Sequence, residues 1–502
     1  MIWLWAGCAS PDSGVAVSLV APADLAVNPY VRELRVTAEE PVSTRVHLTG
    51  ASLDRTAIFA EPTRDLTVPL LGFVPGEAAE VEVIVEGTRT TRRSFHLDLP
   101  PLPARFPIVE VLALDPDAVE PGWTLGNVSV AQGGPSYLVL LDERGAVTWW
   151  WEPTIDVGDL RLGPEGHLWA LAAGSAFELD WMGRGYRHWS NEDQGVGEWI
   201  RLDANGLNHE LALVEGGLLS LENDEIEIQD FPIDYDDPTQ TADVLAEDPV
   251  VLTFDLHGAV TSRRKLSAVL DTHRIGANSL DRHRGLYAWA YANGAAIDPT
   301  DGGVVVSVRH QDALVKLDPD GDLVWILGNH EGWAPEFEPY LLDPVGTPFA
   351  WPYHQHAPEV WPDGTIAAYD NHSHDPASPT FGPSRAAAWR VDPIEGTVSQ
   401  VSAFDVTTTG PLFSAVMGDA DRQPVTGNIL LDHAYVVDEG AGPGAEVGWG
   451  EHWVRLAEVT PDGWVAADLR IRSELDAEPT GWKMYRAERI ATPWAEGVGV
   501  WE

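Results

Sequence analysis

Cysteine is almost absent from this chain, and positive charge is scarce. The 502 residues contain one cysteine, Cys8, so no internal disulfide can form. There are 31 Lys and Arg against 78 Asp and Glu, which gives a formal net charge of −47. Such a surface repels nucleic-acid phosphates and anionic lipid, which argues against binding either. An anionic substrate can bind only where local Arg and His side chains reverse the field.

Long apolar runs are also missing. No segment approaches the roughly 20 apolar residues that a membrane-spanning helix needs, so we expect a soluble body. Apolar residues still make up 44% of the chain, enough for sizeable cores, and its length suits two domains. The 47 Gly and 38 Pro are typical of many short strands joined by tight turns.

The N-terminus carries an export-like pattern. Residues 4–10 read Leu-Trp-Ala-Gly-Cys-Ala-Ser, which resembles the end of a bacterial lipoprotein signal. Residues 1–13 therefore predict an exported protein, periplasmic or at the cell surface, with a lipid anchor at Cys8. Trp5 stands where Leu is usual, and the apolar stretch before Cys8 is short. An ordinary apolar N-terminus with a chance cysteine is the alternative.

Residues 14–98 alternate apolar and polar side chains in short runs, for example at 45–48 and 80–85. This period of two, interrupted by Pro, Gly and Asp turns, predicts a small antiparallel β-sandwich that resembles fibronectin type III and immunoglobulin-like domains. Residues 99–107 are rich in proline and predict a stiff linker. A second domain is expected over residues 108–502.

Two hairpin patterns alternate along this second domain. The first has an apolar-Asp-x-x-Gly turn, and its copies lie at 141–145, 254–258, 317–321, 391–396 and 459–463, with a weaker one near 179–180. The second has turns at 163–166, 214–217, 298–302, 361–364 and 424–427. Two hairpins make one four-stranded blade, so six copies predict a six-bladed β-propeller and an all-β protein. The strand at 484–490 is expected to close the ring against the first blade.

Polar residues recur where each innermost strand should begin, at 208–210, 291–293, 355–356 and 419–421. Equivalent positions of successive blades form a ring around the axis, so these residues predict a shared functional site. Arg309 and Arg385 are permanent cations that can grip an oxyanion. The alternative is that such residues are structural or lie on a solvated face.

The order of motifs between about residues 205 and 490 resembles the arylsulfate sulfotransferase family. These motifs are Asn-His-Glu, Trp-x-Tyr-x-Asn, Val-Arg-His-Gln, Gln-His, Asp-Asn, Ser-Arg, Gly-Asn-Ile-Leu and Tyr-Arg-Ala. The resemblance implies transfer of a sulfuryl group from an aryl sulfate to a phenol through a sulfohistidine, with no nucleotide sulfate donor and no cofactor. A neutral imidazole can attack sulfur and divide the transfer into two displacements.

The resemblance also implies roles for individual residues. It assigns His356, from Gln-His, and Arg385, from Ser-Arg, to catalysis. The nucleophile is placed at His433, because it follows the last inner strand of the sixth blade as the family's nucleophile does. An insertion follows this position, so His452 is the rival. Tyr291 stands where the family has histidine, and Tyr can donate a hydrogen bond but carries no positive charge at neutral pH. The expected substrate-binding residues are Tyr291, Asn293, His209, Arg309, His310 and Asn371.

No metal site is expected. The Asp-rich turns at 298–302 and 318–322 belong to the repeat and lack the EF-hand ligand order. His354, His356, His372 and His374 have no accompanying zinc framework. A second function stays open: an exported propeller without catalysis that binds a ligand or protein at the same rim. The oligomeric state is also open, a homodimer included.

Overall fold

The computed structural model describes residues 14–130, 133–373, 383–404, 412–437, 452–474 and 481–501. The predicted signal with Cys8, and also His374, lie outside these residues. Nearly all regular structure in the described part is strand, which confirms the all-β prediction. No helix in these ranges has the length and apolar character to cross a membrane. The helical segments are short 3-10 turns, Leu266–Ala268 (η1), Arg309–Gln311 (η2) and Pro335–Tyr340 (η3).

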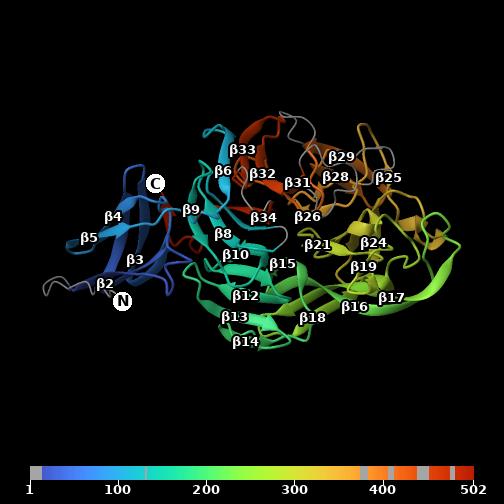
Figure 1. Cartoon of the computed structure of the whole chain (residues 1–502), viewed down its shortest axis with the longest axis horizontal. Helices are drawn as coiled ribbons and strands as arrows, with labels where there is room; N and C mark the ends of the chain where they lie inside the picture. The colour runs from blue at the N-terminus through green and yellow to red at the C-terminus, as the bar shows by residue number, and fades with distance from the viewer. Residues whose placement is uncertain are drawn as a thin grey trace.

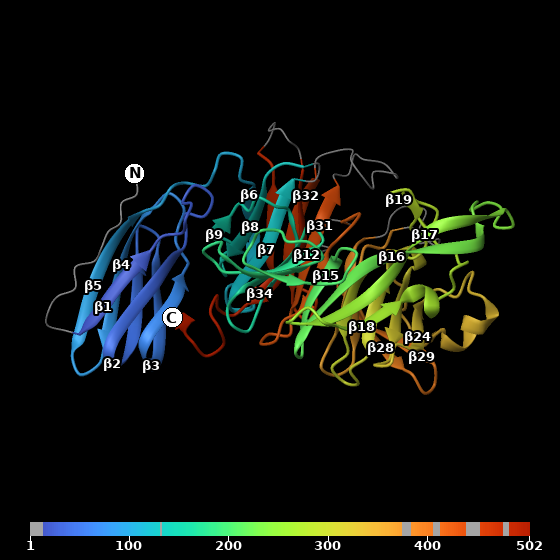
Figure 2. The same ribbon diagram turned by 90° about the horizontal axis from the view of Figure 1, so that it is seen from below.

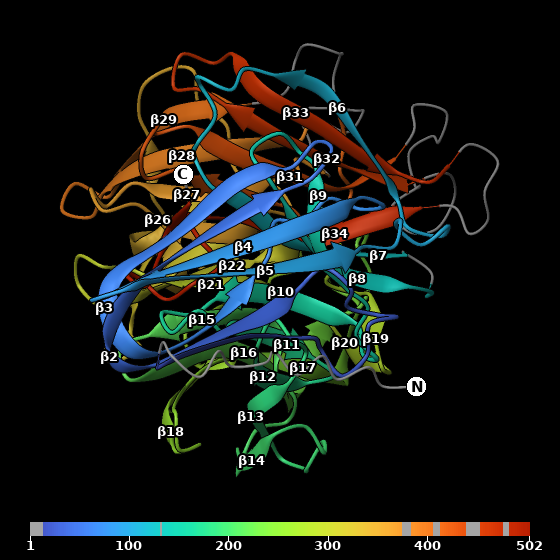
Figure 3. The ribbon, with the colours of Figure 1, turned by 90° about the vertical axis from the view of Figure 1, so that its left-hand side faces the viewer.

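A separate β-unit stands in front of the ring (Figures 1 and 3). Strand β1 pairs with the first half of β2, and β4 pairs with its second half. The register of β2 against β3 shifts between Thr37 and Val42, and such irregularities bend strands. The unit closes over an apolar core that includes Val46 and Val81. Its strands are β1 (Val15–Val20), β2 (Arg32–Thr49), β3 (Asp54–Leu70), β4 (Ala78–Glu86), β5 (Thr90–Asp98) and the C-terminal β35 (Val500–Trp501).

Strand β4 illustrates why these residues form strands. Val81, Val83 and Val85 are buried, the two residues between them are half-buried, and the flanking Glu80 and Glu86 are exposed. Because side chains alternate between the faces of a strand, this spacing turns one face to the core and the other to water. The period-two pattern of the sequence is therefore the burial pattern of the sheet.

Six sheets form the propeller, as the alternating hairpins predicted (Figure 1). The first three sheets are given from the axis outward. Blade one contains β34 (Trp482–Ile490), β7 (Trp123–Val130), β8 (Ser136–Leu141) and β9 (Val147–Trp151). Blade two contains β10 (Val157–Leu162), β11 (Leu168–Ala172), β12 (Ser175–Leu179), β13 (Gly185–Ser190) and β14 (Glu198–Arg201). Blade three contains β15 (Asn208–Val214), β16 (Gly217–Pro232), β17 (Thr241–Asp255), β18 (Val260–Lys265), β20 (Leu286–Tyr287) and β19 (Arg282–His283).

The other three blades follow the same plan. Blade four contains β21 (Ala292–Ile297), β22 (Val304–Val308), β23 (Ala313–Leu317) and β24 (Leu323–Gly328). Blade five contains β26 (His356–Val360), β27 (Ile366–Asp370), β28 (Arg385–Asp392), β29 (Thr397–Phe404) and β25 (Asp343–Pro344). Blade six contains β30 (Asp419–Arg422), β31 (Ile429–Val437), β32 (His452–Val459), β33 (Val465–Arg472) and β6 (Ile108–Leu114).

The repeated Asp-x-x-Gly turns have a common physical basis. In the first copy, the Asp142 carboxylate accepts hydrogen bonds from the backbone N–H groups of Arg144 and Ala146, at 3.0 and 2.9 Å. Gly145 has a φ of 77°, a conformation that costs glycine little. The Asp255 carboxylate makes the equivalent bonds in blade three. The turn residues therefore recur because each outer hairpin needs the same cap.

The ring is closed by strands from both ends of the propeller sequence. Strand β34 forms the inner edge of blade one by pairing with β7, which confirms the predicted closure. Strand β6 forms the outer edge of blade six by pairing with β33. The chain then returns to the front unit, where β35 pairs with β3 (Figure 2). The sequence did not indicate this last pairing, because β35 is too short to show a period.

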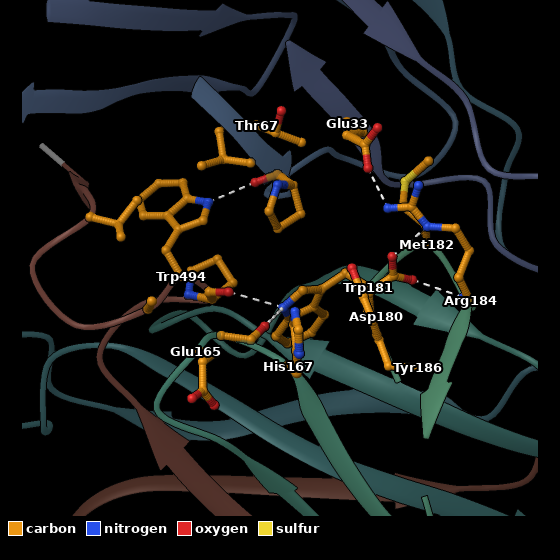
Figure 4. Close-up of a pocket in the computed structure, with 16 residues that line it drawn as sticks. Glu33, Thr67, Glu165, His167, Asp180, Trp181, Met182, Arg184, Tyr186 and Trp494 are labelled. Carbon is orange, nitrogen blue, oxygen red and sulfur yellow. Dashed lines mark hydrogen bonds and ion pairs between the residues drawn. The ribbon is translucent and has the colours of Figure 1, made fainter. Parts of the chain in front are cut away.

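The front unit contacts blade two and the C-terminal segment directly. Trp494 donates its indole N–H to the carbonyl of Pro69 at 2.7 Å, and Arg184 bridges Glu33 and Asp180 (Figure 4). Trp181 donates to the carbonyl of Pro493 at 2.9 Å. A cavity of about 150 Å³ lies between these groups. The contacts tie the front unit to the ring through polar bonds as well as apolar packing.

Buried ion pairs hold the innermost strands of blades one to three together. Arg486 on β34 contacts the Glu210 carboxylate at 2.6 and 2.7 Å and lies 3.5 Å from Asp159. Arg161 on β10 bonds Glu488 and contacts Glu210 at 3.1 Å. Burial alone would raise the pKa of Glu210, but Arg486 and Arg161 lower it, so the carboxylate stays charged.

We therefore predict that Arg486→Met is strongly destabilising. It leaves Glu210 buried with less of its charge balanced, a change that typically costs about 3 to 5 kcal/mol. Thermal or denaturant unfolding measures the loss. The control is Arg390→Met, which removes an exposed ion pair with Asp363 and should change stability by less than about 1 kcal/mol. Equal effects of the two substitutions would contradict a stabilising role for the inner pairs.

Candidate functional site

The inner strands begin with backbone irregularities that aim polar side chains toward one end of the channel. The pairing register shifts between Asn208 and Leu211 in blade three. Similar shifts occur at the start of β21 in blade four and of β26 in blade five. His209 and Tyr291 have left-handed φ angles of 60° and 52°. Such bulges and strained residues often redirect side chains at functional sites.

A chain of rings runs across three blades at this end. The His209 and Tyr291 rings meet edge-on at 5.2 Å, and Tyr291 stacks on His310 at 4.7 Å. His310 is in turn 6.0 Å from His354. Tyr485, on the closing strand, donates its hydroxyl to the His209 carbonyl at 2.8 Å, and the hydroxyl oxygen lies 3.1 Å from Nδ1 of the same ring. That oxygen therefore accepts a hydrogen bond from the Nδ1–H group, which leaves the ring lone pair on Nε2 of His209.

Arg309 supplies the positive charge of this cluster. It lies in η2, where its Nη1 donates to Nε2 of His310 at 2.9 Å. His310 must then carry its own proton on Nδ1, which donates to the carbonyl of Ala288 at 2.6 Å. Burial, followed by Arg486 and Arg309, lowers the pKa of His209 to about 4. His209 is therefore neutral at physiological pH.

His356 is held as a neutral base. Its Nδ1 lies 2.6 Å from Oδ1 of Asn371. The Asn371 amide is oriented because its Nδ2 donates to the carbonyls of Ser414 and Met417, at 2.8 and 3.0 Å. Nδ1 therefore carries the proton, and Nε2 keeps a lone pair that accepts from the backbone N–H of Met417 at 3.2 Å. Burial and then Arg309 lower the pKa of His356 well below 6.5.

Asn293 braces the loop that carries His356. Its Nδ2 donates to the carbonyl of Gln355 at 2.8 Å, from β21 across to the start of β26. The Gln355 amide donates in turn to Ser307 Oγ and to the carbonyl of Ala313. Both Asn293 and Asn371 are buried, and their hydrogen bonds hold His356 and the preceding Gln355 in place.

Arg385 occupies a different setting from Arg309. Its Nε and Nη2 both donate to one oxygen of the Asp370 carboxylate, at 3.0 and 2.8 Å. The other oxygen of Asp370 accepts from the backbone N–H groups of Tyr353 and His372. Arg385 therefore pairs with a carboxylate that also fixes two loops of blade five.

His433 and His452 lie in the packed layers of blade six. The Nδ1 of His433 shares a hydrogen bond of 2.7 Å with the Tyr369 hydroxyl, and the side chain is completely buried. Burial, with Arg455 beside it, lowers the pKa of His433 to about 3. His452 stacks on Tyr435 at 4.1 Å and bonds its hydroxyl at 3.0 Å. The structure thus places these histidines against tyrosines, whereas Arg309 and His209 are near enough to His356 to lower its pKa.

A large polar cavity of about 1100 Å³ opens onto the ring cluster. Blades two and three form its walls, together with the β19–β20 hairpin. His209 and Tyr291 lie at its inner end, and both are partly exposed. Asp224, Lys265 and Arg284 also line it. The described residues contain no cluster of three or more His, Cys, Asp or Glu side chains arranged to hold a metal ion.

Sequence reasoning did not single out three residues of this region. Tyr485 lies in the Tyr-Arg-Ala motif, but its contact with His209 depends on ring closure, which brings together positions 276 residues apart. His354 precedes His356 by two positions, and the spacing signals only a possible ligand pair. Asp312 binds His354 from a left-handed position after η2. No local pattern marks that contact.

Comparison with known proteins gives the chain a family. The profile of the family described as Arylsulfotransferase (ASST) matches residues 110–470. The arylsulfate sulfotransferase AssT of Escherichia coli O6:H1 is 31% identical over 163 residues, which are 28% of this chain and 27% of that protein. The enzyme of the same name from Lelliottia amnigena is 28% identical over 163 residues, with the same coverage. The aligned part thus spans about a quarter of these curated relatives.

A solved lyase structure resembles this chain distantly. A streptogramin B lyase aligns with 75% of this chain and 91% of its own at 10% identity, with a TM-score of 0.33. This value is too low to support any argument about function. The family match covers most of the propeller, including every strand that contributes to the ring cluster except β34. The chain therefore belongs to the arylsulfotransferase (ASST) family.

Proposed function

We propose that this protein transfers a sulfuryl group from an aryl sulfate to a phenol, and that Nε2 of His356 is the nucleophile. The observation that carries the proposal is the fixed tautomer of His356, which leaves the lone pair on Nε2. The positive charge of Arg309 helps to lower the pKa of this ring, so the ring stays neutral. A neutral imidazole is the form that attacks sulfur. His433, the nucleophile expected from the sequence, is a rival that the same experiment tests.

The proposed reaction has two displacements. Nε2 of His356 attacks the sulfur atom, an N–S bond forms, and the bond from sulfur to the aryl oxygen breaks with its electron pair going to that oxygen. The acceptor phenol then attacks the same sulfur, and the N–S bond breaks to free His356. The proton that the acceptor loses neutralises the departed aryl oxide, so no nucleotide donor or cofactor is consumed.

Three residues are suited to stabilise the charges, or to accept the proton, of the two displacements. Arg309 would stabilise the sulfuryl oxygens and the aryl oxide as a permanent cation. Burial raises the pKa of Tyr291, so its hydroxyl remains a donor toward the same oxygens. His209 keeps a lone pair on Nε2, which suits it to take the proton of the acceptor phenol. Asn293 and Asn371 would act by positioning His356.

Arg385 fits a supporting role in this scheme, because Asp370 already neutralises its charge. The cavity in front of His209 and Tyr291 would admit donor and acceptor. We further propose that the reaction takes place outside the cytoplasm, as the signal-like residues 1–13 indicate. Replacement of the family histidine by Tyr291 favours one alternative, a propeller that binds its ligand without turning it over.

The nucleophile is tested with 4-nitrophenyl sulfate as donor and phenol as acceptor. His356→Ala should lower phenol-dependent release of 4-nitrophenol by more than about 10³-fold, because no other base replaces the attacking nitrogen. His433→Ala should keep transfer within about tenfold while lowering thermal stability. Mass spectrometry of the protein trapped with donor alone should find the sulfuryl group on His356. The reverse pattern would move the nucleophile to His433, and no release by the parent protein would favour the binding propeller.

Acid should inhibit this protein less than an ordinary histidine would suggest. The pKa of His356 is lowered by burial and Arg309, so the free base persists below pH 6.5 and is lost only as pH falls through the lowered value. We expect the acid limb of kcat/KM against pH to lie below 6.5. Measuring kcat/KM from pH 4 to 8 tests this expectation. An acid limb with its midpoint near or above pH 6.5 would contradict the proposed environment of His356.

Tyr291 is expected to contribute through its hydroxyl. Tyr291→Phe keeps the ring stacked on His310 and removes one donor, so kcat should fall by about 10- to 10³-fold. Tyr340→Phe, at an exposed position outside the cavity, is the matched control and should leave kcat unchanged. Unaltered turnover in Tyr291→Phe would remove this hydroxyl from the reaction.

A further inference from the structure

The cavity between the front unit and the ring lies apart from the ring cluster (Figure 4). Its walls come from strands β2 and β3 of the front unit, from two turns of blade two, and from the segment 493–498 that leads to β35. No described residue lines both this cavity and the polar cavity in front of His209. Ligand sites occur preferentially at boundaries between domains, so this position makes the cavity a candidate site.

Aromatic and sulfur-containing side chains form much of the wall. Trp181 and Met182 come from blade two and Trp494 comes from the C-terminal segment, and all three are buried. The stacked rings of His167 and Tyr186, whose centroids are 4.3 Å apart, also line the cavity. An apolar cavity of about 150 Å³ has room for a molecule of the size of benzene. The flexible thioether of Met182 can adapt to its shape, so the cavity suits a small ligand with a flat apolar body.

Hydrogen bonds fix the two tryptophans. Nε1 of Trp181 donates to the carbonyl oxygens of Gly166 and Pro493, at 3.0 and 2.9 Å. Nε1 of Trp494 donates to the carbonyl oxygen of Pro69 at 2.7 Å. These bonds use the one N–H donor that each indole has. The rings therefore offer a ligand their apolar surface, and the cavity is formed before a ligand arrives.

The charges on the wall favour a cation. Arg184 bridges Glu33 and Asp180. Arg35 also pairs with Glu33, so both of these carboxylates have cationic partners. Glu165 is exposed, and its carboxylate has no ion pair or hydrogen bond among the residues that the structure describes. A positive group would therefore meet an unpaired carboxylate at this point, whereas an anion would also meet the field of a chain with a formal net charge of −47.

We propose that this cavity binds a small organic cation, an aryl or alkyl ammonium whose apolar body lies against Trp181 and Trp494 and whose ammonium group faces Glu165. Aromatic rings attract cations as carboxylates do, so body and charge are recognised together. The bound ligand contacts the front unit, blade two and the C-terminal segment at once. Binding therefore favours the arrangement in which the front unit is docked on the ring. The site does not depend on sulfuryl transfer.

Isothermal titration calorimetry of the full chain at pH 7 tests the ligand class with three probes of similar size, benzylammonium, benzyl alcohol and benzoate. Benzylammonium should bind about threefold more tightly than the alcohol, because an exposed ion pair contributes modestly, and benzoate should bind most weakly. Glu165→Gln should lower the affinity for benzylammonium to that for the alcohol and leave the alcohol unchanged. Glu395→Gln, at an exposed turn of blade five, should change neither affinity. Benzylammonium that binds no more tightly than benzoate would overturn the proposal.

Variants that fill the cavity locate the site. Ala495→Leu and Thr67→Phe add bulk at two of its walls and should abolish binding of benzylammonium and benzyl alcohol alike. Ala23→Leu, at an exposed position outside the cavity, should leave both affinities unchanged. Because the ligand binds the folded arrangement, benzylammonium should raise the unfolding temperature of the parent protein and of Ala23→Leu, but of neither filled variant. Undiminished binding in a folded filled variant would overturn the site.

Discussion

The buried charges between the first three innermost strands are the constraint on which the propeller depends. Arg486 and Arg161 lie among carboxylates from three blades; Arg486 is buried and Arg161 is partly exposed. A buried charge without a partner is costly, so these strands must meet in one arrangement if the ring is to close. Toward blades five and six, the cluster contains more carboxylates than cations. Burial raises the pKa of Glu359 to about 7, and burial with nearby Asp419 raises the pKa of Asp421, so some of this excess charge is removed by protonation.

Strand β34, which closes the ring, contributes both to the stability of the fold and to the protonation of the ring cluster. Arg486 fixes β34 to Glu210, and the preceding residue, Tyr485, determines which nitrogen of His209 is protonated. Across the channel, Asn371 and Arg309 set the protonation of His356 and His310 by the same means. The site is therefore defined less by which histidines it contains than by the donor or acceptor that each ring faces. These partners lie on different blades, so the closed ring is needed to assemble them.

The sequence was informative where one physical requirement recurs. Each outer hairpin needs a capped turn, so Asp142, Asp255 and their equivalents mark the blades, and alternation along β4 marks the front unit. The polar residues that begin the inner strands were also predictable from the repeat. The contact of Tyr485 with His209 and the pairing of Arg385 with Asp370 were not, because they depend on tertiary contacts that no local pattern marks. Tyr369 beside His433 is a contact of the same kind, between blades five and six.

The placement of β6, β34 and β35 has a consequence for how the molecule is completed. Blade one lacks its inner strand, blade six its outer strand and the front unit its strand β35 unless both ends of the chain are present together. During synthesis the chain emerges with its N-terminal part first. The early blades can pair internally, but neither the ring nor the front unit can be finished before β34 and β35 have been made. The contact between Tyr485 and His209 would thus form only after β34 has joined blade one.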